Sequence, residues 1–313
     1  MTSVSSPKLT LGSLLLPIAL TCGTGAWPVS ATGQIIVAHR GASHDAPENT
    51  LAAFQLAWQQ DADAIEGDFW LSGDGEIVCM HDSTTKRTAD VDLQVADTSL
   101  ATLRQLDVGR WKDRRFAGQQ VLTLPQVLAL VPQKKSIFIE VKCGPEIVPA
   151  LATTLKTYGV SPQQAIIISF QEDVIAAVKR ELPQYRAYWV VSFRVAKDSG
   201  EWTPGIDRII STASRIGADG VDVSAKPPLT RDFVRRCRDA GLSVHAWTVD
   251  DPTQANELSA LGVESITTNR PAVVRRELNG APQTQPVTVT TGTTGSPPSG
   301  SPAMFRQSDH AGK

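Results

Sequence analysis

Three carboxylates stand inside apolar segments of the sequence, where such groups are rarely found. Glu66 and Asp68 are two residues apart in Ile65-Glu66-Gly67-Asp68-Phe69, and Glu140 lies in Ile137-Phe138-Ile139-Glu140-Val141. Because side chains alternate along a strand, Glu66 and Asp68 would share one face. A charge buried in such a strand is costly unless it is paired or bound to a metal. Carboxylate oxygens suit Mg²⁺ or Ca²⁺ better than Zn²⁺, so these residues predict a site for one divalent cation.

Basic residues accompany the carboxylates. Arg40 follows the apolar run 35–38, and Lys142 lies two residues beyond Glu140. Three negative charges exceed the charge of a divalent cation by one, and Arg40 and Lys142 can neutralise the excess. Together with the cation, these two side chains predict a binding site for a phosphate group.

Two histidines complete the set of reactive side chains. His39 directly precedes Arg40, and His81 ends the ribbon that follows the second apolar run. Cleavage of a phosphoester needs a base for the attacking oxygen and an acid for the departing one, and histidine serves both tasks. Any one of these residues alone is more often structural. Their coincidence at successive strand ends favours a catalytic site.

Short β-branched apolar runs alternate with amphipathic helical patterns from residue 35 onward, over about 245 residues. Eight such runs have the size and rhythm of a (β/α)8 TIM barrel of the α/β class, whose active site lies at the carboxyl ends of its strands. A doubly wound open sheet is the alternative. The predicted strands are 35–38, 63–69, 136–142, 165–169, 187–191, 219–223, 243–249 and 264–267, and the helical patterns include 51–58, 147–157, 173–180, 231–240 and 253–260.

Residues 83–122 interrupt this rhythm. They contain one short helical candidate, Leu100–Leu106, and are too many for an ordinary connection between a strand and a helix. We therefore predict an insertion after the second strand, placed over one mouth of the barrel as a substrate cap.

The two ends of the chain differ from the predicted folded part, residues 34–278. The apolar run Leu9–Leu20 is too short to span a bilayer, and Val29-Ser30-Ala31 offers a small-x-small cleavage site. Residues 1–31 are therefore predicted to be a signal peptide, and the protein to be exported to the periplasm or secreted. A disordered leader on a cytoplasmic protein is the alternative. Residues 281–313 are rich in Thr, Ser, Pro and Gly, which predicts a disordered tail.

Charge and cysteine content exclude some classes of protein. The formal net charge is −2, without the basic excess of a nucleic-acid-binding protein, so an anionic substrate must be attracted by a local site. Cys22 would leave with the signal peptide. Cys79, Cys143 and Cys237 lack the spacing of a metal site and are predicted to be buried thiols rather than a disulfide framework.

An ordered series of motifs resembles the glycerophosphodiester phosphodiesterase family. The resemblance covers roughly residues 36–272, nearly the whole predicted folded part. One such motif would be weak, whereas the whole series in the same order is specific. The motifs are His39-Arg40-Gly41-Ala42, Pro47-Glu48-Asn49-Thr50, Ile65-Glu66-Gly67-Asp68, His81-Asp82, Arg87-Thr88, Thr123-Leu124, Glu140-Val141-Lys142, Ser169-Phe170, Trp247-Thr248-Val249 and Thr268-Asn269-Arg270-Pro271.

The resemblance implies a TIM barrel with a family-specific insertion after the second strand. It implies a divalent metal on the three carboxylates, the two histidines as an acid–base pair, and Arg40 and Lys142 as phosphate ligands. Glu48 would belong to the same site, beside the metal or one step removed from it. Trp247 would give the glycerol end of the substrate an apolar wall. Gly67 departs from the apolar residue that the family usually has there, which bears on substrate preference.

The activity that the resemblance implies is metal-dependent hydrolysis of a glycerophosphodiester to sn-glycerol 3-phosphate and an alcohol. The attacking group is either a glycerol hydroxyl, through a cyclic phosphate, or a water. A lysophospholipase D or sphingomyelinase D-like activity on single-chain lipids is the alternative, and an apolar groove in residues 83–122 would favour it. A non-catalytic binding protein would be expected to lack a histidine or a metal carboxylate, and this sequence has them all.

Overall fold

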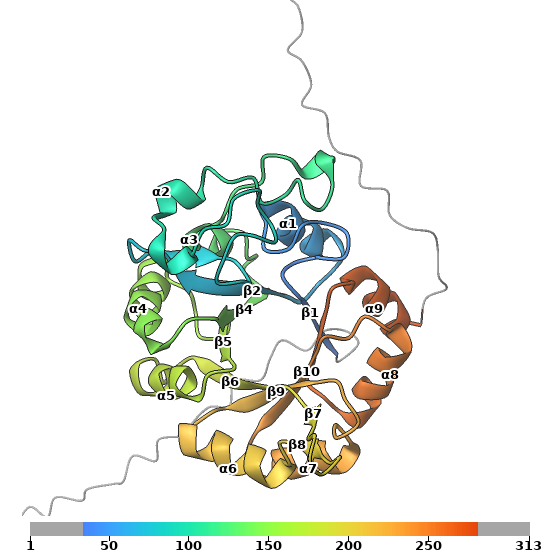
Figure 1. Cartoon of the computed structure of the whole chain (residues 1–313). Coiled ribbons are helices and arrows are strands. Elements are labelled where there is room, and N and C mark those ends of the chain that lie inside the picture. Colours follow the sequence, from blue (N-terminus) through green and yellow to red (C-terminus); the bar gives the residue numbers. More distant parts are fainter. Residues whose placement is uncertain (1–33, 281–313) are drawn as a thin grey trace, which may run out of the picture. The chain divides into compact units, whose positions relative to one another are not determined.

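A computed structural model describes residues 34–280, in which eight parallel strands close into a barrel (Figure 1). Strand β1 pairs with both β2 and β11, which closes the ring and confirms the predicted (β/α)8 barrel over the open sheet. In order around the ring, the strands are β1 (Ile35–Ala38), β2 (Ala64–Leu71), β4 (Ser136–Val141), β5 (Ala165–Ser169), β6 (Arg186–Val191), β9 (Gly220–Ser224), β10 (Ser243–Trp247) and β11 (Ser265–Thr268).

Helices cover the outside of the barrel (Figure 1). The five helical patterns named from the sequence form helices whose ends lie within a residue or two of the predicted ones. Gly159, Gly241 and Gly262 have positive φ angles just after three of them, where a left-handed residue ends a helix. The helices are α1 (Leu51–Gln59), α3 (Leu124–Leu128), α4 (Val148–Thr157), α5 (Glu172–Glu181), α6 (Ile206–Ile216), α7 (Arg231–Asp239), α8 (Pro252–Leu261) and α9 (Pro271–Leu278).

Strand alternation decides what fills the barrel. A core cluster of buried side chains from five adjoining strands fills the interior and reaches the cavity at its carboxyl end. Ala64 on β2 and Phe138 on β4 belong to this cluster, and Glu66, Asp68 and Glu140 follow them at steps of two, on the same inward face. The pleat therefore carries the three carboxylates to the carboxyl end of the barrel. The cluster comprises Ile35, Val37, Ala64, Phe138, Ile166, Ile168, Tyr188 and Val190.

A fully buried histidine lies in this interior on β10 and makes the stability depend on pH. His245 bonds Ser265 at 2.7 Å and stacks on Tyr188 at 4.2 Å, and burial lowers its pKa to about 3. The unfolded chain binds a proton that the folded one rejects between that pKa and about 6.5, so stability is lost as pH falls through this window. We expect His245 alone to cost about 2 kcal/mol of unfolding free energy between pH 7 and pH 5.

Urea unfolding at the two pH values measures this effect. In a His245→Gln variant the difference between pH 7 and pH 5 should shrink by about the same 2 kcal/mol. His44→Gln, at a histidine whose side chain is 47% exposed, is the matched control and should keep the wild-type difference. Equal differences in wild type and His245→Gln would contradict the assignment.

The predicted insertion has a core of its own. Strand β3 (Ile77–Cys79) pairs antiparallel with β2, and the chain then forms η1 (Val95–Asp97), α2 (Leu100–Leu103) and η2 (Arg114–Phe116). Lys112 Nζ donates to the carbonyl of Ser43 at 2.9 Å, which ties the segment to the loop after β1 at the carboxyl end of the barrel. Buried Val78, Met80, Val95, Leu103, Val108 and Val121 form the small core.

Several expectations from the sequence have other outcomes. Cys79 and Cys237 are buried thiols as predicted, whereas Cys143 is only partly buried, so that prediction was wrong for one residue. A short hairpin between β7 (Arg194–Val195) and β8 (Trp202–Thr203) was not predicted. The predicted signal peptide and tail lie outside the described residues.

None of the helices within residues 34–280 is long and apolar enough to cross a membrane.

Candidate active site

The structure brings the three predicted metal ligands together. Asp68 on β2 is in register with Glu140 on β4, and each of Glu66, Asp68 and Glu140 has an oxygen within 4.8 Å of the others. All three side chains are buried, and Glu66 Oε1 makes no hydrogen bond to any residue in the described part of the chain. Three converging hard oxygen donors, two of which (Glu66 Oε1 and Asp68 Oδ1) make no hydrogen bond within the described residues, fit a divalent cation such as Mg²⁺ or Ca²⁺.

The pKa values of the three carboxyl groups also indicate that the cluster lacks positive charge. Burial, with Asp68 and Glu140 nearby, raises the pKa of Glu66 well above its usual range. Burial and Asp68 raise the pKa of Glu140 to about 7. Burial opposes ionisation of Asp68 as well, but Arg40 and Lys142 bring its pKa down to about 2. A cation bound among these oxygens would favour the charged form of all three.

Arg40 and Lys142 contact the carboxylates directly. The Arg40 backbone N–H donates to Glu66 at 2.8 Å, and its guanidinium Nε lies 3.1 Å from Asp68. Lys142 Nζ lies 2.6 Å from Glu140 and 3.3 Å from Asp68. Both basic side chains therefore border the carboxylate cluster, where they could also reach a phosphate bound to a cation held there.

Backbone geometry explains why Arg40 is followed by glycine. Arg40 has a φ of 56° and Gly41 a φ of 79°, so the chain turns through two left-handed residues after β1. A Cβ on Gly41 would lie 2.5 Å from the backbone carbon of Ala53 in α1. The turn aims the backbone N–H of Arg40 at Glu66, and glycine is required for the chain to pass α1.

His39 is held in one tautomer by two residues whose roles were not predicted. Its Nδ1 lies 2.7 Å from Oδ1 of Asn269, and the Asn269 amide nitrogen donates to Asp250 at 2.7 Å. Since the asparagine presents its oxygen, His39 Nδ1 carries the proton and Nε2 is left as an acceptor. Burial, with Arg40 nearby, lowers the pKa of His39 to about 4, so the ring is neutral at pH 7 and suited to act as a base.

His81 is oriented in the same way by a carboxylate. Its Nδ1 lies 2.6 Å from Asp82, which in turn accepts a hydrogen bond of 2.6 Å from Arg87 Nε. Burial lowers the pKa of His81, although Asp68 and Asp82 favour the protonated form. The two histidines thus have different partners, an amide for His39 and a carboxylate for His81.

Glu48 lies beside the site, and its carboxylate oxygens accept hydrogen bonds from two arginines. Arg87 donates to both of its carboxylate oxygens, at 2.8 and 2.7 Å, and Arg40 donates to it at 3.0 Å. Burial opposes its ionisation, but the hydrogen bond from Arg87 and the charge of Arg40 keep its pKa below the usual value. In this structure Glu48 holds Arg40 in place and joins the insertion to the loop after β1.

The reactive side chains described above line one cavity of about 300 Å³. Its lining contains both histidines, Arg40, Lys142, Glu66 and Glu140 as well as apolar side chains. Trp247, predicted as an apolar wall, lines it and meets Phe170 edge to face at 5.4 Å. The remaining lining residues are Ile168, Val190, Asp222, Thr248 and Thr267.

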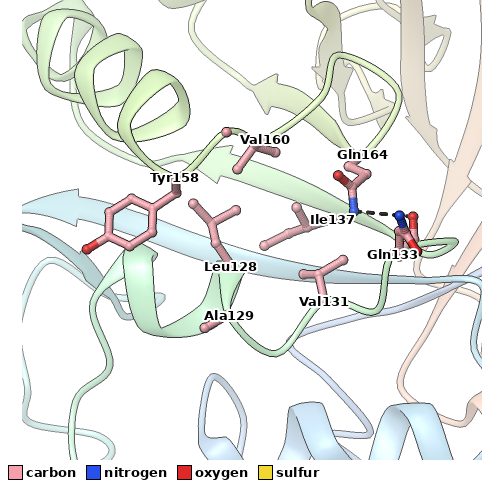
Figure 2. Close-up of a pocket in the computed structure, with 9 residues that line it drawn as sticks. Leu128, Ala129, Val131, Gln133, Ile137, Tyr158, Val160 and Gln164 are labelled. Carbon is pink, nitrogen blue, oxygen red and sulfur yellow. Dashed lines mark hydrogen bonds between the residues drawn. The ribbon is translucent and has the colours of Figure 1, made fainter.

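A second cavity, of about 370 Å³, lies at the opposite end of the strands and carries no such chemistry (Figure 2). It is lined mainly by apolar side chains around the start of β4 and by the segment that leads into β5, and Gln164 donates there to the carbonyl of Gln133 at 3.4 Å. Tyr158 is its one titratable lining residue. The cavity at the carboxyl ends is therefore the candidate active site.

Comparisons with known proteins agree with this geometry. Residues 39–273 match the model of the Glycerophosphoryl diester phosphodiesterase family. The chain is 31% identical to a glycerophosphodiester phosphodiesterase of Caldanaerobacter subterraneus, over 76% of this chain and 94% of that protein. It is 30% identical to one of Bacillus subtilis, over 81% and 92% respectively.

Solved structures show the same similarity. A phosphodiesterase of Oleispira antarctica, in complex with the product sn-glycerol-3-phosphate, aligns with a TM-score of 0.69 and 27% identity, over 78% of this chain and 96% of that one. A glycerophosphodiester phosphodiesterase of Agrobacterium tumefaciens aligns with a TM-score of 0.64 and 28% identity, over 77% and 98%.

Proposed function

This chain belongs to the glycerophosphoryl diester phosphodiesterase family and is an enzyme of that activity, and we propose that it uses one divalent cation, Mg²⁺ or Ca²⁺, held by Glu66, Asp68 and Glu140. The observation that carries the proposal is the convergence of three buried carboxylates with two oriented histidines around one cavity. A divalent cation in that place supplies Lewis-acid stabilisation of the negative charge on the phosphate.

The side chains of this protein account for the rest of the reaction. Arg40 and Lys142 line the cavity and bind the phosphate oxygens through charge-assisted hydrogen bonds. His39, neutral and with Nε2 as its acceptor, takes the proton of the attacking oxygen. His81, backed by Asp82, gives a proton to the oxygen of the departing alcohol. The products are sn-glycerol 3-phosphate and an alcohol.

Glycerophosphodiesters are the proposed substrates, in preference to single-chain lipids. Most apolar side chains of the insertion pack into its own small core, and only Val91 and Trp111 are large apolar residues exposed within it. The glycerol phosphate half is proposed to enter the cavity, and a solved relative in complex with the product sn-glycerol-3-phosphate supports this choice of ligand. The insertion, by its contacts to the loop after β1, acts as a cap over this mouth of the barrel.

A comparison of two choline esters tests this preference. Purified protein with the cation added should hydrolyse glycerophosphocholine with a kcat/KM at least about 100-fold higher than for lysophosphatidylcholine, because most apolar side chains of the insertion are enclosed in its core and give an acyl chain little to bind. Release of choline is the common readout. A higher kcat/KM for lysophosphatidylcholine would reverse the assignment and identify a lysophospholipase D.

Export is proposed on the sequence alone. The apolar run Leu9–Leu20 and the small residues Val29-Ser30-Ala31 support a cleaved signal peptide ahead of the barrel domain. N-terminal sequencing of the protein from periplasm or medium tests this, and a chain recovered uncleaved from the cytoplasm would contradict it.

A further inference from the structure

Two polar groups in the cavity are used by none of the steps above. Asp222 on β9 is 2% exposed and Thr267 on β11 is 3% exposed, and both line the cavity. Asp222 Oδ1 and Thr267 Oγ1 are buried and make no hydrogen bond within residues 34–280. A buried polar atom without a partner costs free energy, and native proteins keep few of them. A partner from outside the chain is therefore expected for both.

Strand register places both groups inside the barrel. Asp222 is in register with Val190, and Thr267 with Val37, and both valines belong to the interior core cluster. The strand between them, β10, contributes Trp247, whose indole N–H donates to the backbone carbonyl of Asp222 at 3.0 Å. The two polar atoms thus come from the strands on either side of the one that carries Trp247.

The chemistry of the pair favours a neutral ligand. Burial, with Glu140 nearby, raises the pKa of Asp222 to about 8, so the carboxyl keeps its proton at pH 7. A protonated carboxyl and a hydroxyl each donate one hydrogen bond and accept others. They carry no charge that would attract an ammonium group. A hydroxyl group matches both, since it also donates and accepts.

We propose that Asp222 and Thr267 bind hydroxyl groups of the glycerol half of the substrate, so that the enzyme selects phosphodiesters of a polyol. This rests on the proposed function and adds a specificity site to it. An apolar wall alone discriminates weakly between a propyl and a glyceryl group. A site with buried hydrogen-bonding groups rejects the analogue that lacks the hydroxyls, because its own groups are then left without partners.

Binding of two small ligands to the cation-loaded protein tests the proposal without turnover. The ligands are sn-glycerol 3-phosphate and n-propyl phosphate, which share the phosphate and the carbon chain and differ only in the hydroxyls. Calorimetry gives the ratio of the two dissociation constants. We expect wild type to bind sn-glycerol 3-phosphate at least about 100-fold more tightly, about tenfold for each of the two groups. Thr267→Val and Asp222→Ala should each lower that ratio by about tenfold, while the affinity for n-propyl phosphate changes much less.

Conservative variants separate this role from a structural one. Thr267→Ser keeps the hydroxyl and Asp222→Asn keeps a donor and an acceptor, so both should retain most of the wild-type ratio. An unchanged ratio in Thr267→Val and Asp222→Ala would overturn the proposal, as would a wild type that does not distinguish the ligands. Failure of the proposed function would instead appear as a wild type that does not hydrolyse glycerophosphocholine, which is a separate measurement.

Discussion

Glu66→Gln is expected to lower hydrolysis of glycerophosphocholine by about 10³-fold and to abolish stabilisation of the protein by added Mg²⁺ or Ca²⁺. Glu66 is one of three carboxylates with oxygens within 4.8 Å of one another. Lewis-acid stabilisation contributes several kcal/mol to a transition state, and each 1.4 kcal/mol is about tenfold in rate. Treatment of wild type with EDTA should cause a loss of the same size, restored by one of the two ions.

Thermal unfolding separates the loss of the ion from damage to the fold. A ligand at 100 times its dissociation constant stabilises the folded state by about 2.7 kcal/mol, so the melting temperature of wild type should rise as the ion is added. In EDTA the wild type loses this stabilisation. Burial raises the pKa of Glu66, so without the ion the charged form of this carboxyl destabilises the folded wild type, whereas the amide of Gln carries no charge. Glu66→Gln should therefore be at least as stable as wild type in EDTA and should gain nothing from the ion.

A matched substitution controls for the loss of negative charge. Glu146 is an exposed carboxylate in the short 3-10 helix Pro145–Ile147 that follows β4, six residues after Glu140, and Glu146→Gln should keep both the activity and the response to the ion. A metal site built from Glu66, Asp68 and Glu140 predicts that Glu140→Gln behaves like Glu66→Gln. If both variants kept full activity in EDTA, the reaction would need no ion and the assignment would fail.

Strand periodicity explains how much of the site could be predicted. Glu66, Asp68 and Glu140 interrupt apolar strands at steps of two, and a parallel barrel leaves only the carboxyl end of its interior for such residues. Local sequence patterns therefore predict the metal cluster and the alternation of strands and helices. Closure of the ring is different, since it depends on the pairing of β1 with both β2 and β11, which no local pattern specifies.

The partners of the reactive groups could not be predicted for the same reason. Asn269 orients His39 across 230 residues of sequence, and Arg87 reaches Glu48 across 39. Thr267, at the end of an apolar run, looks like an ordinary β-branched core residue. Its importance lies in an unpaired oxygen, which becomes visible only when the surrounding side chains are in place.

The departing alcohol distinguishes the two histidines. His81→Ala should lower kcat for glycerophosphocholine by about 10²- to 10⁴-fold, because choline leaves poorly without a proton. With the p-nitrophenyl ester of glycerol phosphate the loss should shrink to a small factor, since p-nitrophenolate leaves without protonation. His39→Ala removes the base and should slow both substrates by similar, large factors. His44→Ala, at an exposed histidine bonded to Asp45, is the control and should not change either rate.

The pH dependence provides an independent test of the same roles. A base acts in its deprotonated form, and the pKa of His39 is about 4, so kcat/KM for wild type should rise with pH through that value and then level off. The profile should fall again at higher pH as His81 loses the proton that it donates, and His81→Ala should lose this falling limb on the p-nitrophenyl ester. If His81→Ala hydrolysed glycerophosphocholine at the wild-type rate, or if both histidine variants responded equally to the better leaving group, the division of roles between His39 and His81 would be wrong.

The amide bonded to His39 and the carboxylate bonded to His81 are the structural reason to expect the two variants to differ. A carboxylate stabilises the protonated ring that an acid requires, whereas an amide does not.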